Sequence, residues 1–270
     1  MPELPEVETV RQVLAQHLCG QEVRAVTVLN GNLRVPVDAH ALSELAGLCV
    51  QQVGRRGKYL WLGFPGRTLV CHLGMSGRFF LAFSRGTPPP HTHVLFAFAS
   101  GLRLFYVDPR RFGLLQVVAE SHSLFSQLGP EPTDTDAVAK QLESARKRKK
   151  VSVRNVLLDQ KLIAGIGNIY ANEALFAAGI RPQTPVSRLS KKQIFALAAA
   201  IGEVTARAVA AGGTTLRDGS FTNALGHPGY FAVELAVYGR EGQACRRCGT
   251  AIRRILLTGR SAFFCPTCQR

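Results

Sequence analysis

Four cysteines near the C-terminus constrain the fold of this chain more than any other feature of its sequence. They form two C-x2-C pairs separated by sixteen residues: Cys245 with Cys248, and Cys265 with Cys268. This spacing is typical of a four-cysteine zinc site on a β-ribbon, because each pair places two thiolates on one tight turn and the spacer fits one hairpin. The spacer carries three arginines, the last of which is Arg260. We therefore predict one structural zinc ion, which fixes a hairpin suited to contact phosphates, and no organic cofactor.

The charge balance indicates the kind of partner. The chain has 33 lysines and arginines against 18 aspartates and glutamates, a net charge of +15. An excess of this size favours binding to a polyanion, because each neutralised phosphate releases condensed counterions. Charges of mixed sign would provide solubility without such an excess. We therefore expect a nucleic acid as the partner.

The sequence also indicates a compartment. No apolar run approaches the length of a membrane span, and the first residues, MPELPEVETV, include acidic residues where a signal peptide would be basic and then apolar. Cys19, Cys49 and Cys71 stand in apolar contexts, which suits buried thiols in a reducing compartment. We expect a cytoplasmic protein without a membrane partner.

One helix and then a series of short strands are expected in the first half of the chain. Residues 6–18 place apolar side chains on one helical stripe, and Gly20 can end that helix. Six runs rich in β-branched and aromatic residues follow, up to about Val118: VRAVTVL, KYLWLGF, RTLVCHL, HVLFAFA, LRLFYV and LLQVV. Many short strands at this spacing predict a β-sandwich or a flattened barrel.

The second half is expected to be helical, which makes the fold class α+β. The periodic apolar residues predict helices at residues 153–157, 168–178 and 190–211, and an S-x-x-Q capping box opens the last one. A glycine-rich turn precedes the second helix, where Asn168 can cap the helix and its free N–H groups suit a phosphate. The long Gly-rich and polar loop at residues 212–229 is typical of a functional lid.

The N-terminus holds a candidate nucleophile. Removal of the initiator methionine would expose Pro2 as a secondary amine, and an α-amine titrates near pH 8, so a useful fraction is unprotonated at neutral pH. Attack of this amine on a sugar C1′ would give a cationic iminium, which is a good electron sink. Glu3 is the adjacent candidate acid or base. Taken alone, a Met-Pro start indicates only N-terminal trimming.

Motifs along the whole chain resemble those of bacterial formamidopyrimidine-DNA glycosylase. In order they are MPELPEVETV, GKYL, HLGMSGRF, DPRRFG, GIGNIYANEALF, GGTTLRD, GYF with VYGREGQAC, and the four-cysteine ribbon. The resemblance implies a bifunctional base-excision repair enzyme for oxidised purines, chiefly 8-oxoguanine opposite cytosine and ring-opened formamidopyrimidines. It also implies a monomer that binds duplex DNA with a damaged base in a cleft between two domains. The expected parts are a catalytic β-sandwich domain (1–130), a hinge with a basic run (131–150), a helix–two-turn–helix domain (151–235) and a zinc ribbon (236–270).

The resemblance implies catalytic roles for four residues. Pro2 is similar to the family's Schiff-base nucleophile and Glu3 to its general acid/base. Lys58 matches the proton donor in β-elimination, and Arg260 matches the residue assigned to δ-elimination.

It also implies DNA contacts. Phosphates around the extruded nucleotide would be held by Lys58, His72, Asn168 and Arg260. The space left by the flipped base would be filled by Met75, Arg110 and Phe112, with Arg110 donating to the orphaned cytosine. These three lie in Gly-bounded turns, which favours exposure at loop tips. Further DNA-contacting positions are matched by His91 and Lys149, and Arg154 stands where many relatives carry lysine.

Two alternatives remain at this level. The sister family, endonuclease VIII, shares Pro2, Glu3 and the ribbon but prefers oxidised pyrimidines, and it generally lacks the Met75, Arg110 and Phe112 set. The other alternative is a non-catalytic zinc-ribbon DNA-binding protein. Retention of Pro2, Glu3 and Lys58 argues against it.

Overall fold

The computed structural model describes residues 2–83, 86–119, 125–216 and 221–270. These residues form two compact units, each of which combines two stretches of chain. The first unit comprises Met1–Ser126 and Ala211–Tyr230, and the second comprises Gln127–Ala210 and Phe231–Arg270. The four expected parts, with their bounds, remain a prediction.

The first unit is a sandwich of two antiparallel sheets, as the strand pattern predicts. One sheet has the strand order β1-β6-β7-β5 and the other has the order β2-β3-β4-β8. Their bounds are β1 Val23–Val28, β2 Gln52–Arg56, β3 Tyr59–Phe64, β4 Arg67–His72, β5 Arg78–Ala82, β6 Thr92–Phe98, β7 Arg103–Val107 and β8 Leu114–Val118. Apolar side chains from both sheets share one core. Strands β2 and β5 were not among the six expected runs.

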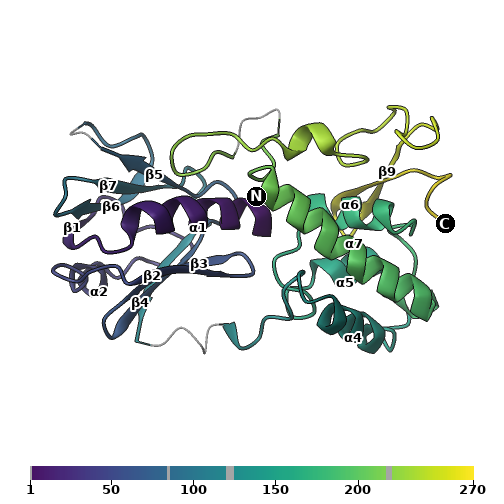
Figure 1. Cartoon of the computed structure of the whole chain (residues 1–270), viewed down its shortest axis with the longest axis horizontal. Coiled ribbons are helices and arrows are strands. Elements are labelled where there is room, and N and C mark those ends of the chain that lie inside the picture. Colours follow the sequence, from purple (N-terminus) through teal and green to yellow (C-terminus); the bar gives the residue numbers. More distant parts are fainter. Residues whose placement is uncertain (1, 84–85, 120–124, 217–220) are drawn as a thin grey trace. The chain divides into compact units, whose positions relative to one another are not determined.

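Helix α1 (Leu4–Leu18) packs against β2 and β3 in the same unit (Figure 1). Its predicted stripe is confirmed, because Val7, Leu14 and Leu18 are fully buried in the sandwich core. The helix begins two residues before the expected start, since Glu3 is its N-cap. A short helix, α2 (Ala39–Ser43), also belongs to the first unit.

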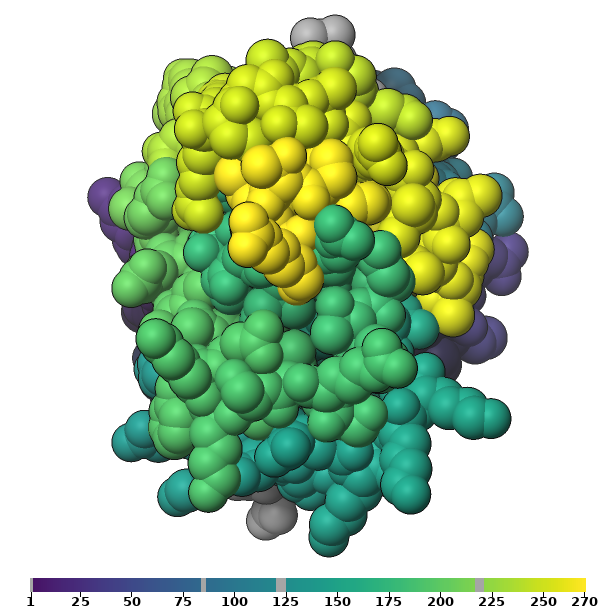
Figure 2. All heavy atoms as spheres, turned by 90° about the vertical axis from the view of Figure 1, so that its right-hand side faces the viewer, coloured from purple at the N-terminus to yellow at the C-terminus, as the bar shows by residue number. Residues whose placement is uncertain are grey.

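The second unit is helical and ends in a hairpin. Its elements are α4 Thr135–Ala145, α5 Val153–Leu158, α6 Asn168–Ala177, the 3-10 turn η1 Val186–Arg188, α7 Lys191–Ala210, the 3-10 turn η2 Phe231–Glu234, β9 Arg253–Leu257 and β10 Arg260–Phe264. The α7 capping box is confirmed, since Ser190 and Gln193 exchange hydrogen bonds between side chain and backbone N–H. In Figure 2 the C-terminal residues, in yellow, cover part of the surface of this unit above the green and teal helices.

Helix α7 is long and apolar enough, by length and composition alone, to cross a membrane. It packs against α4 and α6, and the apolar side chains of one face, among them Leu197 and Ile201, are fully buried, whereas Phe195 is 55% exposed. These contacts are those of a helix with one buried face inside the second unit.

The predicted lid belongs to the first unit and contacts its strands. Thr214 and Tyr230 pair with each other near the two ends of the loop, and the N–H of Leu81 in β5 donates to the carbonyl of Ala224. Phe221 and Ala224 belong to the sandwich core. Residues 217–220 lie outside the described residues, so the lid role stays a prediction.

Candidate active site and metal centre

The four cysteine sulfurs converge on one point. All four Sγ atoms lie within 4.8 Å of one another, with Cys245 and Cys268 at 3.9 Å and Cys248 and Cys265 at 3.4 Å. Zinc–thiolate bonds of about 2.3 Å in a tetrahedron give sulfur–sulfur distances of about 3.8 Å, so the cluster fits this ion. Thiolates fill every coordination position, which makes the zinc structural, as predicted.

A two-residue turn presents Arg260 at the tip of the zinc hairpin. Thr258 and Gly259 both have positive φ, 47° and 76°, which is the conformation of the tight hairpin turn whose twist matches the strands. Leu257 and Arg260 pair across the turn, and the Arg260 side chain is exposed. The metal and this turn together give Arg260 a rigid base.

Glu6 organises the N-terminal segment, a role that the sequence did not reveal. One of its carboxylate oxygens accepts the N–H of Glu3 at 2.8 Å, and the other accepts the N–H of Thr214 at 2.8 Å. Pro2, Glu3 and Glu6 are all buried. The carboxylate therefore ties the start of α1 to the loop at residues 211–216. Glu3 and Glu6 have the spacing of a capping box, and this spacing was the sequence signal that could have indicated the role of Glu6.

Lys58 and His72 lie at the ends of adjacent strands. Lys58 is 8% exposed in the turn between β2 and β3, and its neighbour Tyr59 pairs with His72. The Nδ1 atom of His72 accepts the N–H of Gly74 at 2.9 Å. Burial, with Arg34 and Lys58 nearby, lowers the pKa of His72 to about 4. His72 is therefore neutral at neutral pH, and the hydrogen bond to Nδ1 assigns its proton to Nε2, where it can be donated.

Met75, Arg110 and Phe112 are exposed on two turns, as expected. Met75 is 38% exposed and Phe112 is 45% exposed. The guanidinium of Arg110 lies 5.2 Å from the centroid of the Phe112 ring. Two apolar side chains and one multiple hydrogen-bond donor therefore stand out from neighbouring loops of the same unit.

The two turns are joined by Asp108, which the sequence did not single out. Its carboxylate accepts the Ser76 hydroxyl at 2.5 Å and the N–H of Gly113 at 2.8 Å. The Ser76 hydroxyl also accepts the N–H of Arg110 at 3.1 Å. A Cβ on Gly74 would lie 2.5 Å from the backbone of Phe112. Only glycine allows this approach, so the two turns form one rigid feature.

The prediction that Asn168 caps a helix is wrong. Gly167 is the N-cap of α6 and Asn168 is the first helical residue, with its Nδ2 donating to the Ser261 carbonyl at 3.1 Å. Its Oδ1 accepts from Arg154 at 2.6 Å. The side chain is thus held by the hairpin and by Arg154 instead of the helix end.

The structure groups the remaining candidates by unit. His91 is exposed with a positive φ of 63° in the first unit, and Lys149 is exposed after α4 in the second. The first unit also holds the residues from Pro2 to Phe112, whereas Asn168, Arg260 and the cysteines belong to the second unit.

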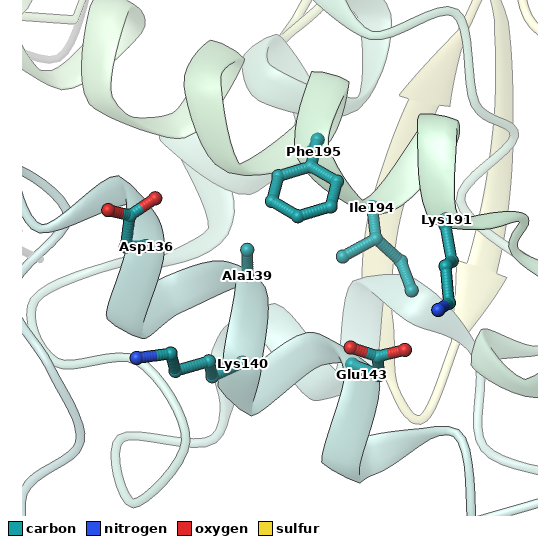
Figure 3. A pocket seen from close by; sticks show the side chains of 7 residues that line it. All are labelled: Asp136, Ala139, Lys140, Glu143, Lys191, Ile194 and Phe195. Carbon is teal, nitrogen blue, oxygen red and sulfur yellow. The ribbon is translucent and has the colours of Figure 1, made fainter.

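A pocket of about 210 Å³ between α4 and α7 holds none of these residues (Figure 3). Ile194 and Phe195 of α7 face α4 across it, and its other lining residues are Asp136, Ala139, Lys140, Glu143 and Lys191. Its rim carries charges of both signs, and these lining residues include no histidine, cysteine or serine. The pocket is therefore a poor candidate for the reaction.

Comparisons with known proteins agree along the whole chain. Residues 1–115 match the Formamidopyrimidine-DNA glycosylase N-terminal domain, residues 128–220 match the Formamidopyrimidine-DNA glycosylase H2TH domain, and residues 242–270 match the zinc finger found in FPG and IleRS. The chain is 46% identical to the Formamidopyrimidine-DNA glycosylase of Laribacter hongkongensis, with 100% of both chains covered. It is 47% identical to that of Pseudomonas aeruginosa, again over 100% of both.

Solved structures are similar over the same length. The MutM (FPG) protein from Thermus thermophilus has a TM-score of 0.88 at 40% identity, covering 99% of this chain and 98% of that one. Lactococcus lactis Fpg in a complex with DNA containing an abasic site has a TM-score of 0.89 at 34% identity, covering 99% of each chain. A complex of a mutant of Lactococcus lactis FPG with Fapy-dG-containing DNA has a TM-score of 0.90 at 35% identity, covering 100% of each chain.

Proposed function

This chain belongs to the formamidopyrimidine-DNA glycosylase family, the DNA glycosylases of base excision repair, and from that membership we propose that it excises oxidised purines from duplex DNA and then cleaves the strand. The substrates would be 8-oxoguanine and formamidopyrimidines, and strand cleavage would proceed by β,δ-elimination. The Lactococcus lactis complexes with Fapy-dG and abasic-site DNA support this substrate class. A cytoplasmic monomer is part of the same proposal.

The observation that carries the proposal is that Pro2 and Glu3 are adjacent at the start of α1. Both residues are buried, and the helix N-terminus behind them carries a partial positive charge that favours the uncharged amine. Burial removes water that would otherwise solvate and compete with the nucleophile. Glu3 supplies a carboxyl group within the same segment for proton transfer.

In the proposed reaction the Pro2 nitrogen attacks C1′ of the damaged nucleotide. A nitrogen–C1′ bond forms as the glycosidic bond breaks, and the electron pair leaves with the base, which takes up a proton. The nitrogen loses its proton, the C1′–O4′ bond breaks with O4′ taking up a proton, and the nitrogen lone pair forms the C=N bond of the iminium. Its positive charge allows loss of a C2′ proton and departure of the 3′ phosphate, and a second elimination releases the 5′ phosphate.

Other residues would hold the extruded nucleotide. Met75 and Phe112 offer apolar surface to replace lost stacking, and base extrusion costs a few kcal/mol. Lys58, Asn168 and Arg260 would contact phosphates, with neutral His72 as a further donor through Nε2. Zinc has no open coordination position and would act only by holding the hairpin that carries Arg260.

Borohydride trapping tests the covalent step. Reduction during turnover on a duplex with 8-oxoguanine should yield a protein–DNA adduct that maps to the N-terminal peptide. Pro2→Gly should slow excision by at least about a hundredfold, because it removes the secondary amine that forms the covalent intermediate, while duplex binding survives. An adduct on Lys58 would contradict the assignment, and preferential trapping on thymine glycol would contradict the substrate class.

A further inference from the structure

Arg154 in α5 is fully buried, and by volume it is the largest fully buried side chain in the described part of the chain. Its guanidinium donates to the carbonyls of Leu257 and Ser261 at 3.2 and 3.3 Å, and to Asn168 Oδ1 at 2.6 Å. All three acceptors are neutral, and the Nε atom has no hydrogen-bond partner among the described residues. Burying a cation without a carboxylate partner is costly, which indicates a role beyond packing.

The two carbonyls that Arg154 binds lie on either side of the hairpin turn. Leu257 is the last residue of β9 and pairs with Arg260, and Ser261 directly follows Arg260 in β10. The guanidinium therefore holds both strands at the point from which Arg260 projects. The next residue of α5, Asn155, adds a third contact, since its Oδ1 accepts a hydrogen bond from the Thr258 hydroxyl at 3.2 Å.

The same guanidinium fixes the orientation of Asn168. Because Asn168 Oδ1 faces Arg154, its Nδ2 is turned to the Ser261 carbonyl at 3.1 Å. Ser261 therefore accepts from both side chains, which closes a triangle of hydrogen bonds. Asn172 donates to the same Oδ1 at 3.3 Å from one turn further along α6.

The charges in this triangle favour an anion. Burial, with the positive charge of Arg260 nearby, lowers the pKa of the Arg154 guanidinium. Two cations in this arrangement repel each other, and a phosphate at the hairpin tip would relieve the repulsion. A lysine could not reproduce the contacts, because only a planar fork spans three acceptors in fixed directions.

We propose that Arg154 is a positioning residue that holds Arg260 and Asn168 in one phosphate-binding geometry. Its role rests on the proposed function, since the phosphate is that of the cleaved DNA strand. Without the hydrogen bonds of Arg154, the hairpin tip is less rigid. The rate of δ-elimination, the step assigned to Arg260, then falls more than the rate of β-elimination.

The test compares Arg154→Met, which keeps bulk and removes charge, with Arg154→Lys and the control Arg188→Met, an exposed arginine of the same unit. Zinc content reports whether the ribbon is intact. Amide hydrogen exchange at residues 255–262, measured without DNA, reports the hairpin tip. An abasic-site duplex gives the ratio of δ- to β-elimination products.

Arg154→Met should retain zinc, exchange its tip amides about tenfold faster or more, and accumulate β-product at the expense of δ-product. Arg154→Lys should fall between this variant and the wild type, and Arg188→Met should match the wild type. Unchanged exchange and product ratio in Arg154→Met overturn the proposal. If that variant does not fold, unchanged values in Arg154→Lys overturn it instead. Should the wild type process no oxidised duplex, the proposed function fails, while tip exchange still decides the positioning role.

Discussion

Single buried polar residues set the geometry of the candidate site. Glu6 holds the N-terminal segment, Asp108 joins the two exposed turns, and Arg154 holds the hairpin tip. None of these side chains needs to touch DNA to matter, because each one fixes the backbone from which a predicted contact residue projects. Their hydrogen bonds also satisfy groups whose burial would otherwise be costly.

Arg110 is expected to set the preference for the opposite base. Its guanidinium can donate to the O2 and N3 acceptors of cytosine, whereas adenine offers a C–H where cytosine has O2. One wrong base contact costs on the order of 1–3 kcal/mol, so the wild type should excise 8-oxoguanine opposite cytosine well ahead of adenine. Single-turnover rates for both duplexes should show that Arg110→Ala slows the cytosine duplex most. Arg111→Ala is the control, and a flattened ratio there instead would move the role to Arg111.

His72 should give the protein a pH-dependent stability. Its pKa is lowered from 6.5 to about 4, so the unfolded chain binds a proton that the folded chain does not between these values. The contribution of neutral His72 to the free energy of unfolding is complete above pH 6.5 and is lost as the pH falls toward 4. Urea unfolding at pH 7 and pH 4.5 should show that the wild type loses on the order of 2 kcal/mol more than His72→Gln does. Equal losses would show that His72 titrates normally.

At the scale of elements, the zinc hairpin depends on α6 as well as on its metal. The carboxylate of Glu173 in α6 accepts the backbone N–H groups of Ala236, Val237 and Tyr238 at 2.8–3.0 Å. Asn172 accepts the N–H of Phe263 in β10 at 2.7 Å. The ribbon is therefore attached to the helical part by side chains of α6, in addition to the contacts of Arg154 and Asn155 in α5, and the zinc joins the hairpin's own two C-x2-C turns.

Removal of one zinc ligand should consequently unfold the hairpin and leave the helices. Cys248→Ser should lose the metal, and duplex affinity should fall by about a hundredfold or more, because Arg260 loses its rigid base. Zinc analysis, circular dichroism and fluorescence anisotropy measure these effects. Cys49→Ser, the same change outside the cluster, should leave all three unchanged. Cys19 and Cys49 are exposed, so the expectation of buried thiols is wrong for these two and holds for Cys71. Normal DNA binding by metal-free Cys248→Ser would contradict the role of the ribbon.

At the scale of the whole molecule, the charge of +15 should make DNA binding strongly dependent on salt. Lys149 is exposed in the basic block that follows α4. Lys149→Ala should weaken all duplexes alike and reduce the slope of log affinity against log salt by about one. Lys140→Ala, at an exposed site on α4, is the control and should keep the wild-type slope. An unchanged slope for Lys149→Ala would remove this residue from the phosphate contacts.

The sequence by itself determined the features that depend on spacing along the chain. The C-x2-C pairs specified the metal site, and the stripe of Val7, Leu14 and Leu18 specified α1. The series of short strand-like runs predicted a β-sandwich or a flattened barrel, and the structure is the sandwich. Such patterns are local, so short-range geometry is enough to interpret them. Strand β2 was missed because glycine and polar residues interrupt its apolar pattern, although it pairs with the next strand, β3. Strand β5 is a short run directly after a Gly-bounded turn, and it pairs with β7, which is not its neighbour along the chain.

Only the tertiary structure decided what the buried polar side chains do. Asn168 appeared to be a helix cap, but Arg154 and the Ser261 carbonyl, distant in sequence, compete for its amide and hold it. Glu6 accepts a hydrogen bond from the N–H of Thr214, which lies 208 residues further along the chain. Hydrogen bonds of this kind leave no periodic signal, because they depend on where the packed elements bring donors and acceptors together. Packing is governed by the apolar pattern, and the polar contacts follow from it.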